Sequence, residues 1–443
     1  MAAGWVPAAV LLTARSAWAL WERVIHEWPV QTALGGFAAP VGIMLYADRL
    51  AVLMTLALAV GTLVLWPRPA RGTVRSTVRG GTVRGPIEPA GLPDPSASGR
   101  GERSGVVGGF VQRIRFYEIV AVASYGLAAS SGSGNGQAAA LRYLVVGATG
   151  SAMALLGIAM VYAATGVLGF ADLARAGQAL ETPLGLAAFL FIVIGFGVKA
   201  ELFPFNTWVP EVYQEAPGRV SGLLAGFASK LALIVVLRLL VLVFTGQAAH
   251  ELIAVLGILG IVSGELAAWR APTVRQMLAY SSIGQLGLVA LAFALSGSAG
   301  LGAAEIVAGV ALILHHMVLK PALFLIADRW GGTLATLEGG AAVSPLAAGL
   351  FVLFALSMLG VPPLPGFWSK FLLLRAALAH GQPLFLLGAG AVLARSRCSR
   401  RPICSASPGV CSAPPVGEAP PSLPCPRGFR RPICCRPWLW GAF

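Results

Sequence analysis

Cysteine and charge are both scarce in this sequence. All six cysteines lie after residue 397, and only 11% of the 443 residues are charged. The apolar part of the chain contains neither a cysteine ligand set nor a nucleotide-binding loop, so we expect no redox centre there. The cysteines after residue 397 form no C-x-x-C pair and have no histidine nearby, which argues against zinc. We therefore expect no cofactor and no metal ion, and no redox chemistry by this chain alone.

Apolar residues dominate instead. They make up 57% of the chain, and the mean hydropathy is +0.78. So much apolar surface does not fit a soluble core and indicates helices facing lipid. The longest apolar runs are Leu50–Trp66, Leu141–Ala163, Leu184–Phe203, Val220–Phe244, Leu252–Trp269 and Ile306–Ala327. Weaker candidates are Trp5–Trp21, Ile119–Ala129, Ile283–Leu295, Pro345–Leu359, Phe367–Ala379 and Pro383–Ala394.

These runs predict an all-α fold, a polytopic transmembrane helical bundle of about 10 to 12 helices. We expect an integral, multi-pass protein of the bacterial inner (cell) membrane. Composition divides the chain into four segments. They are N-terminal transmembrane helices (1–66), an Arg/Gly-rich disordered loop (67–115), a second transmembrane domain (116–394) and a Cys/Pro/Arg-rich, aberrant tail (395–443).

The net charge of +14 comes from arginines gathered in the loop and the tail. Basic patches can bind nucleic acid, but no recognition motif and no interleaved aromatic residues accompany these arginines. We therefore expect no nucleic-acid partner.

Lysine is reserved for special positions. The chain has four lysines, each in or at the edge of an apolar run: Lys199, Lys230, Lys320 and Lys370. A lysine at the bilayer centre costs about 2.5–3.5 kcal/mol on insertion scales, so we expect a function to retain them. A buried lysine can lose and regain its proton, whereas a guanidinium stays charged. The pattern indicates a proton relay; the alternative is that a lysine reaches the interface or simply pairs with a carboxylate.

Two further groups fit a relay. Glu118 starts a short apolar segment and is the only acid there, so it can pair with a lysine. His316 and Lys320 are four residues apart, which places them on one face of a helix. Histidine titrates near neutral pH, so this pair can pass a proton. His315 points elsewhere on the helix and is expected to serve packing or to lie at the membrane interface.

Prolines predict two broken helices. Pro204 follows Lys199 by five residues, and Pro362, Pro363 and Pro365 precede Lys370. Interrupted helices at membrane depth persist where they line a polar cavity. Broken helices in two corresponding halves are typical of inverted repeats around an ion site.

Three motifs carry a family resemblance. They are K-A-E-L-F-P-F-N-T-W-V-P-E-V-Y-Q-E-A-P from Lys199, P-T-V-R-Q-M-L-A-Y-S-S-I-G-Q-L-G from Pro272, and L-S-M-L-G-V-P-P-L-P-G-F-W-S-K-F from Leu356. In this order they resemble the antiporter-like membrane subunits of respiratory complex I and of Mrp cation:proton antiporters. The match runs from about Phe116 to about Leu393, and its details are similar to both the NuoN and the MrpD type. The resemblance implies that the domain at 116–394 is an antiporter-like, proton-conducting domain.

The resemblance implies a proton-translocating subunit of a complex-I-like NADH-quinone oxidoreductase, partnered by other membrane subunits. Its charged axis would consist of Glu118, Lys199, Lys230, His316, Lys320 and Lys370. Two alternatives stay open. One is a subunit of a Mrp-type Na+/H+ antiporter, with Na+ as a coupled ion. The other is a truncated, non-functional product, since family members have further helices where this chain has the Arg/Gly repeat and the tail.

Overall fold

The computed structural model describes residues 2–26, 30–34, 43–47, 49–65, 110–297, 302–330 and 344–381, together with residues 383 and 390. Residues 67–109 of the expected Arg/Gly-rich loop lie outside the described residues. Its last positions, 110–115, are not a loop, because they belong to helix α4 (Phe110–Ala128). The tail at 395–443 also lies outside them. Of the weak helix candidate Pro383–Ala394, only residues 383 and 390 are described.

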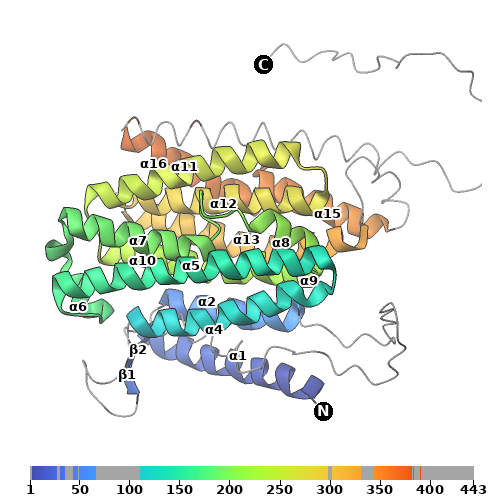
Figure 1. Cartoon of the computed structure of the whole chain (residues 1–443). Helices are drawn as coiled ribbons and strands as arrows, with labels where there is room; N and C mark the ends of the chain where they lie inside the picture. The colour runs from blue at the N-terminus through green and yellow to red at the C-terminus, as the bar shows by residue number, and fades with distance from the viewer. Residues whose placement is uncertain are drawn as a thin grey trace, which may run out of the picture.

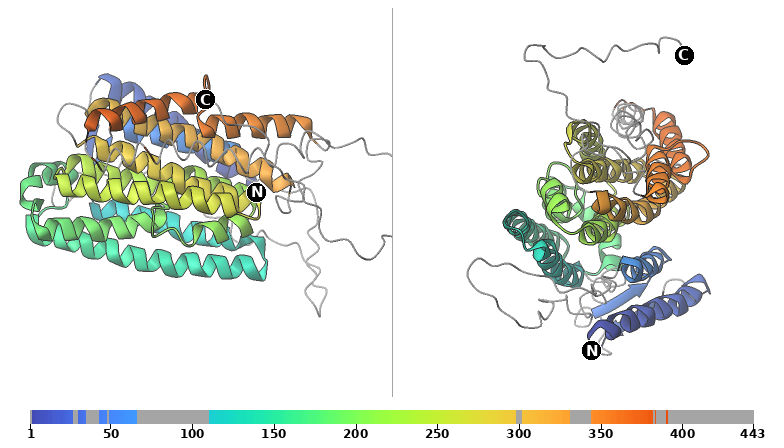
Figure 2. Two further views of the ribbon diagram at one scale, coloured as in Figure 1. Left: turned by 90° about the horizontal axis from the view of Figure 1, so that it is seen from above. Right: turned by 90° about the vertical axis from the view of Figure 1, so that its right-hand side faces the viewer.

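The described helices lie side by side along roughly one direction (Figure 1), and the right-hand view of Figure 2 looks down their length. The longer elements are α1 (Ala2–His26), α2 (Arg49–Leu65), α4, α5 (Gly134–Thr165), α7 (Pro183–Lys199), α10 (Ser229–Leu242), α11 (Gln247–Arg270), α12 (Val274–Leu295), α13 (Gly302–Trp330), α15 (Pro345–Leu359) and α16 (Pro365–His380). Short elements join them: η1 (Ala129–Ser131), α6 (Phe170–Arg175), η2 (Gly177–Leu180), α8 (Val209–Glu215), α9 (Gly218–Leu223) and η3 (Leu224–Ala228).

One small strand pair interrupts the helical pattern. β1 (Val30–Leu34) and β2 (Ile43–Ala47) pair antiparallel between α1 and α2, with Val30 opposite Ala47. The sequence analysis did not predict this hairpin, whose two five-residue strands lie between the apolar segments that become α1 and α2. The helical membrane fold itself is as predicted.

Local chemistry sets where several helices begin. Thr182 caps α7 by accepting a hydrogen bond from the Gly185 amide, and Pro183 follows at the first helical position. Thr273 caps α12 in the same way through the Gln276 amide. Both residues satisfy amides that a helix start leaves without an intrahelical partner.

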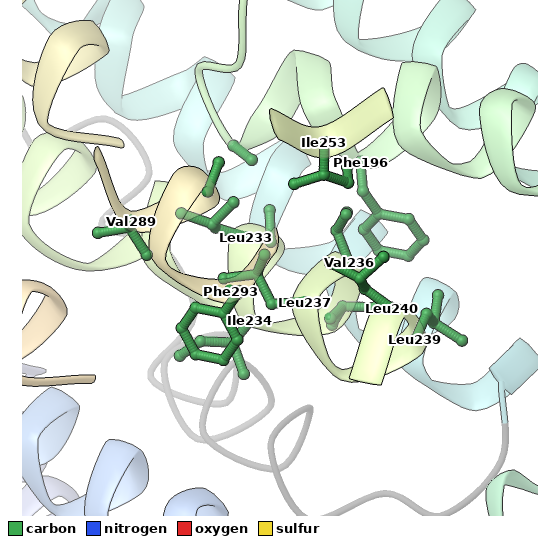
Figure 3. Packing of buried hydrophobic residues seen from close by; sticks show 14 of the residues in the cluster. Phe196, Leu233, Ile234, Val236, Leu237, Leu239, Leu240, Ile253, Val289 and Phe293 are labelled. Atoms are coloured by element: carbon green, nitrogen blue, oxygen red, sulfur yellow. The ribbon is translucent and has the colours of Figure 1, made fainter. Parts of the chain in front are cut away.

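Burial separates central helices from peripheral ones. Of the 18 most apolar consecutive residues of each helix, 89% are buried in α12 and 83% in the continuous stretch Gly218–Leu242. The corresponding fractions are 39% in α5 and 44% in α11. Figure 3 shows Leu233 and Val236 of α10 packed among side chains of α7, α11 and α12. The outer helices expose large apolar side chains, for example Leu155 of α5 and Leu259 of α11.

This pattern is that of a protein embedded in lipid. Five helices of the described part are long and apolar enough to cross a membrane, and three shorter apolar helices accompany them. An outer surface of leucine and valine is stable against acyl chains and unfavourable in water. The chain is an integral, multi-pass membrane protein.

Small residues allow the closest helix contact. A Cβ atom on Gly287 of α12 would lie 2.5 Å from the backbone oxygen of Gly257 in α11. Helices in lipid associate through such packing, since burial of apolar surface supplies little drive there. The glycines therefore fix the distance between the central helix α12 and the peripheral helix α11.

Candidate functional site

Glu118 and Lys199 form an ion pair between α4 and the last residue of α7. The side chain of Lys199 is 4% exposed, while that of Glu118 is 39% exposed. Ser151 of α5 completes the contact: its hydroxyl donates to Glu118 Oε1 at 2.5 Å and accepts from Lys199 Nζ at 2.9 Å. Each charge compensates the other, so both can persist in an apolar bundle.

Tyr117 connects this pair to the helix that carries Lys230. The Lys199 ammonium lies 5.1 Å from the centre of the Tyr117 ring, in range of a cation–π attraction. The Tyr117 hydroxyl donates to the backbone oxygen of Ala228 at 2.7 Å. The residue next to Glu118 therefore holds α4 against the turn that precedes Lys230.

The first broken helix is confirmed. α7 ends at Lys199 and α8 begins at Val209, with Pro204 between them. The indole of Trp208 donates to the backbone oxygen of Val198 at 2.8 Å and stacks on Tyr143, with 3.8 Å between ring centres. This bond satisfies a carbonyl that the helix end would otherwise leave without a partner.

Lys230 sits just after a π turn. η3 has π geometry and lies between α9 and α10, and such turns are frequent at functional sites. The Lys230 ammonium donates to the backbone oxygen of Ala225 inside this turn, and to the Ser229 hydroxyl at 2.9 Å. The side chain is buried. Backbone and hydroxyl dipoles therefore hold this cation.

Lys320 forms a hydrogen bond to helix α12. Its ammonium donates to the backbone oxygen of Leu278 at 2.5 Å, and the residue has no exposed surface. Pro321 follows inside α13, where it removes one helical hydrogen bond. The π turn packs directly on this proline: a Cβ atom on Gly226 would lie 2.5 Å from Pro321 Cγ. The position of Lys320 therefore depends on a glycine in η3.

We expect Gly226→Ala to destabilise the fold by about 1–3 kcal/mol, because the added methyl overpacks the contact with Pro321. The matched control is Gly349→Ala in α15, where a Cβ atom meets nothing within 4 Å. That replacement should be neutral or slightly stabilising, as alanine favours helices over glycine. Thermal unfolding in detergent measures both. Equal melting temperatures would show that η3 and α13 are not tightly packed.

The second broken helix holds Lys370. α15 ends at Leu359 and α16 begins with Pro365, as predicted. The Lys370 ammonium donates to the backbone oxygen of Met358, which also accepts from the side-chain amide of Gln285 at 3.1 Å. A carbonyl at a helix end is electron-rich and has no intrahelical partner, so it suits a cation.

The two histidines differ in their contacts. His316 is buried one turn before Lys320, as their spacing predicted. His315 was expected to pack or to lie at the interface, and its Nε2 lies 2.8 Å from the hydroxyl of Ser357 in α15. This contact ties α13 to the helix that ends beside Lys370. The two imidazole groups point about 100° apart around α13.

The structure joins Glu118 to Lys199 directly and places the other three lysines on separate backbone carbonyls. Sequence reasoning missed Ser151, Glu201 and His315. Glu201 had a usable signal, since it stands two residues after Lys199 in the same apolar motif. Ser151 had none, because serine is common in membrane helices. Among the residues that the structure describes, no group of three or more His, Cys, Asp or Glu side chains could hold a metal ion.

The sequence also matches a family model. Residues 112–394 fit the transmembrane family described as NADH:quinone oxidoreductase/Mrp antiporter. The chain belongs to this family. The matched segment contains both broken helices and all four lysines, so the geometry above lies inside the family domain.

Relatives come from both branches of the family. The chain is 35% identical to NADH-quinone oxidoreductase subunit N of Desulforudis audaxviator over 61% of its own length and 55% of the relative's. It is 28% identical to a Na(+)/H(+) antiporter subunit of Bacillus subtilis over 80% of its own length and 71% of the relative's. The chain thus spans little more than half of the first relative.

A solved structure has the same fold. A chain of the membrane-bound sulfane sulfur reductase, an archaeal respiratory membrane complex, superposes with a TM-score of 0.77 at 27% identity. The superposition covers 91% of this chain and 81% of that one. The helix arrangement therefore extends beyond the family match into the N-terminal helices.

Proposed function

We propose that the chain is a proton-translocating membrane subunit of a complex-I-like NADH-quinone oxidoreductase. The observation that carries this proposal is the set of buried lysines, one in ion contact with Glu118 and three held by backbone carbonyls. Such charges are costly at membrane depth and are retained for ion transfer. The similarity to the oxidoreductase relatives supports the same assignment.

In this proposal protons move along the six predicted residues. Glu118 holds the proton-loaded Lys199, and separation of the pair lets Lys199 release its proton inward. Lys230 receives it as a neutral amine and becomes an ammonium. Lys320 with His316 forms the next station, and Lys370 at the second helix break is the last. Each transfer leaves one amine neutral and makes the next one charged, so charge is conserved.

Reconstitution of the full chain in liposomes containing a pH-sensitive dye tests this proposal. An imposed pH gradient should relax faster than in empty liposomes, and Lys370→Met should slow the relaxation. The protein must be equally abundant and correctly inserted in both preparations. Relaxation at the rate of empty liposomes would contradict the proposal and favour the truncated, non-functional product.

A second candidate is a subunit of a Mrp-type Na+/H+ antiporter. The 28% identity to the Bacillus subtilis antiporter subunit, over 80% of the chain, favours it. The two functions differ in the ion requirement. A sodium gradient should drive proton movement only in the antiporter, so the same liposomes loaded with Na+ separate the candidates. We also propose other membrane subunits as partners of either form.

A further inference from the structure

Glu201 is an acid with no exposed surface, in the break between α7 and α8. Lys199, two residues earlier, forms its ion pair with Glu118 and not with Glu201. An ionised carboxylate in such a place is costly unless cations and hydrogen bonds compensate it. The question is which groups do so.

One side of the carboxylate is fixed. The hydroxyl of Tyr213 on α8 donates to Glu201 Oε1 at 2.5 Å. Tyr213 is itself fully buried and packs edge-on against Trp208, with 5.9 Å between ring centres. The other oxygen, Oε2, makes no direct hydrogen bond to any residue that the structure describes. Glu201 therefore has one anchored oxygen and one available oxygen.

Packing brings the carboxylate and two lysines into one region, and both Lys230 and Lys320 act on Glu201 electrostatically. Tyr213, which anchors Glu201, packs edge-on against Phe324, one turn after Lys320 on α13, with 5.4 Å between ring centres. The π turn that holds Lys230 packs on Pro321, which follows Lys320. Ser229, next to Lys230 in the chain, accepts a hydrogen bond from the Lys230 ammonium at 2.9 Å. Glu201 is thus the acid shared by the lysines of η3–α10 and α13.

The backbone at Glu201 is also unusual. Its φ of 58° lies in the left-handed region, which glutamate seldom adopts and glycine or asparagine adopts easily. Strained conformations of this kind persist where the surroundings enforce them, often at functional sites. A glycine here would relieve the strain but would remove the carboxylate.

We propose that Glu201 transfers protons between Lys320 and Lys230, through its unanchored oxygen. This rests on the proposed function and adds a second acid to it. In one direction, the Lys320 ammonium gives a proton to the carboxylate, which leaves a neutral amine and a carboxylic acid. The acid then protonates the neutral Lys230 amine and returns to a carboxylate. The reverse sequence uses the same two steps.

Glu201→Gln tests the transfer, because an amide keeps the size and accepts the Tyr213 hydrogen bond but cannot take a proton. Proton flux in liposomes should fall by about tenfold or more, since positioned acid–base groups typically contribute at least that much. The matched control is Glu211→Gln on the same broken helix, where the glutamate is 44% exposed and pairs with Arg142 at the surface. Its flux should equal that of the parent. Parent-like flux in Glu201→Gln would overturn the proposal.

Infrared spectroscopy of the purified full chain separates this proposal from the proposed function. A carboxylic-acid band that Glu201→Gln removes should appear during a pH titration, and Lys230→Met should shift the pH at which it appears. This holds whether or not the chain conducts in liposomes. A carboxylate that never takes a proton, or one insensitive to Lys230→Met, would overturn the role of Glu201. Absence of parent flux with the band present would instead overturn the proposed function alone.

Discussion

Lys230→Arg is expected to reduce proton flux by on the order of a hundredfold while the protein still folds and inserts. The replacement keeps a positive charge, but a guanidinium does not release its proton in proteins. The Lys230 ammonium donates to the Ala225 backbone oxygen and to the Ser229 hydroxyl at a buried position. We expect the proton flux to fall because arginine cannot release and regain a proton there. Dye-loaded liposomes measure the rate.

Overpacking is the competing explanation, since arginine is larger than lysine and the site is buried. Lys230→Met separates the two, because it fits the site and also cannot carry a proton. Both variants should lose flux, and only Lys230→Arg should also lower the melting temperature. Arg142→Lys, at the exposed surface, is the control for a conservative exchange and should behave as the parent. Full flux in Lys230→Arg would remove Lys230 from the path.

Much of this architecture could be predicted from the sequence. Hydropathy located the membrane helices, and the prolines after Lys199 and before Lys370 located both breaks. These features depend on local chemistry, since length, hydropathy and a missing amide act within a few residues. The sequence also indicated that Glu118 can pair with a lysine, since isolated charges in apolar surroundings compensate each other best by contact, and the structure shows Lys199 as its partner.

Other features could not be predicted, because they depend on how distant segments meet. The π turn of η3 has an ordinary helical sequence, and its Gly226 packs on Pro321, which lies far along the chain on α13. Ser151 became part of the site because α5 packs beside α7. Helical geometry alone placed His315 away from the face of Lys320, and only the packing of α15 brings Ser357 to it as a partner.

The Glu118–Lys199 pair gives the second large effect. Glu118→Gln and Lys199→Met should each strongly reduce proton flux, since the pair places a charged lysine at the start of the path. The double replacement should lose less than the sum of the two losses, because each single change also leaves the remaining partner uncompensated. Ser151→Ala is a useful companion, as it removes the shared hydroxyl and keeps both charges.

Unequal burial of the pair predicts unequal effects on stability. Glu118→Gln leaves an ammonium that is only 4% exposed, whereas Lys199→Met leaves a carboxylate that is 39% exposed and has more room to rearrange. Glu118→Gln should therefore lower the melting temperature more than Lys199→Met. The coupling energy should be about 1 kcal/mol, toward the low end for contacting residues, because Ser151 can still hydrogen-bond the partner that remains. Strict additivity in both flux and unfolding, with all variants equally abundant in the membrane, would show that the two residues do not communicate and would remove the proposed entry gate.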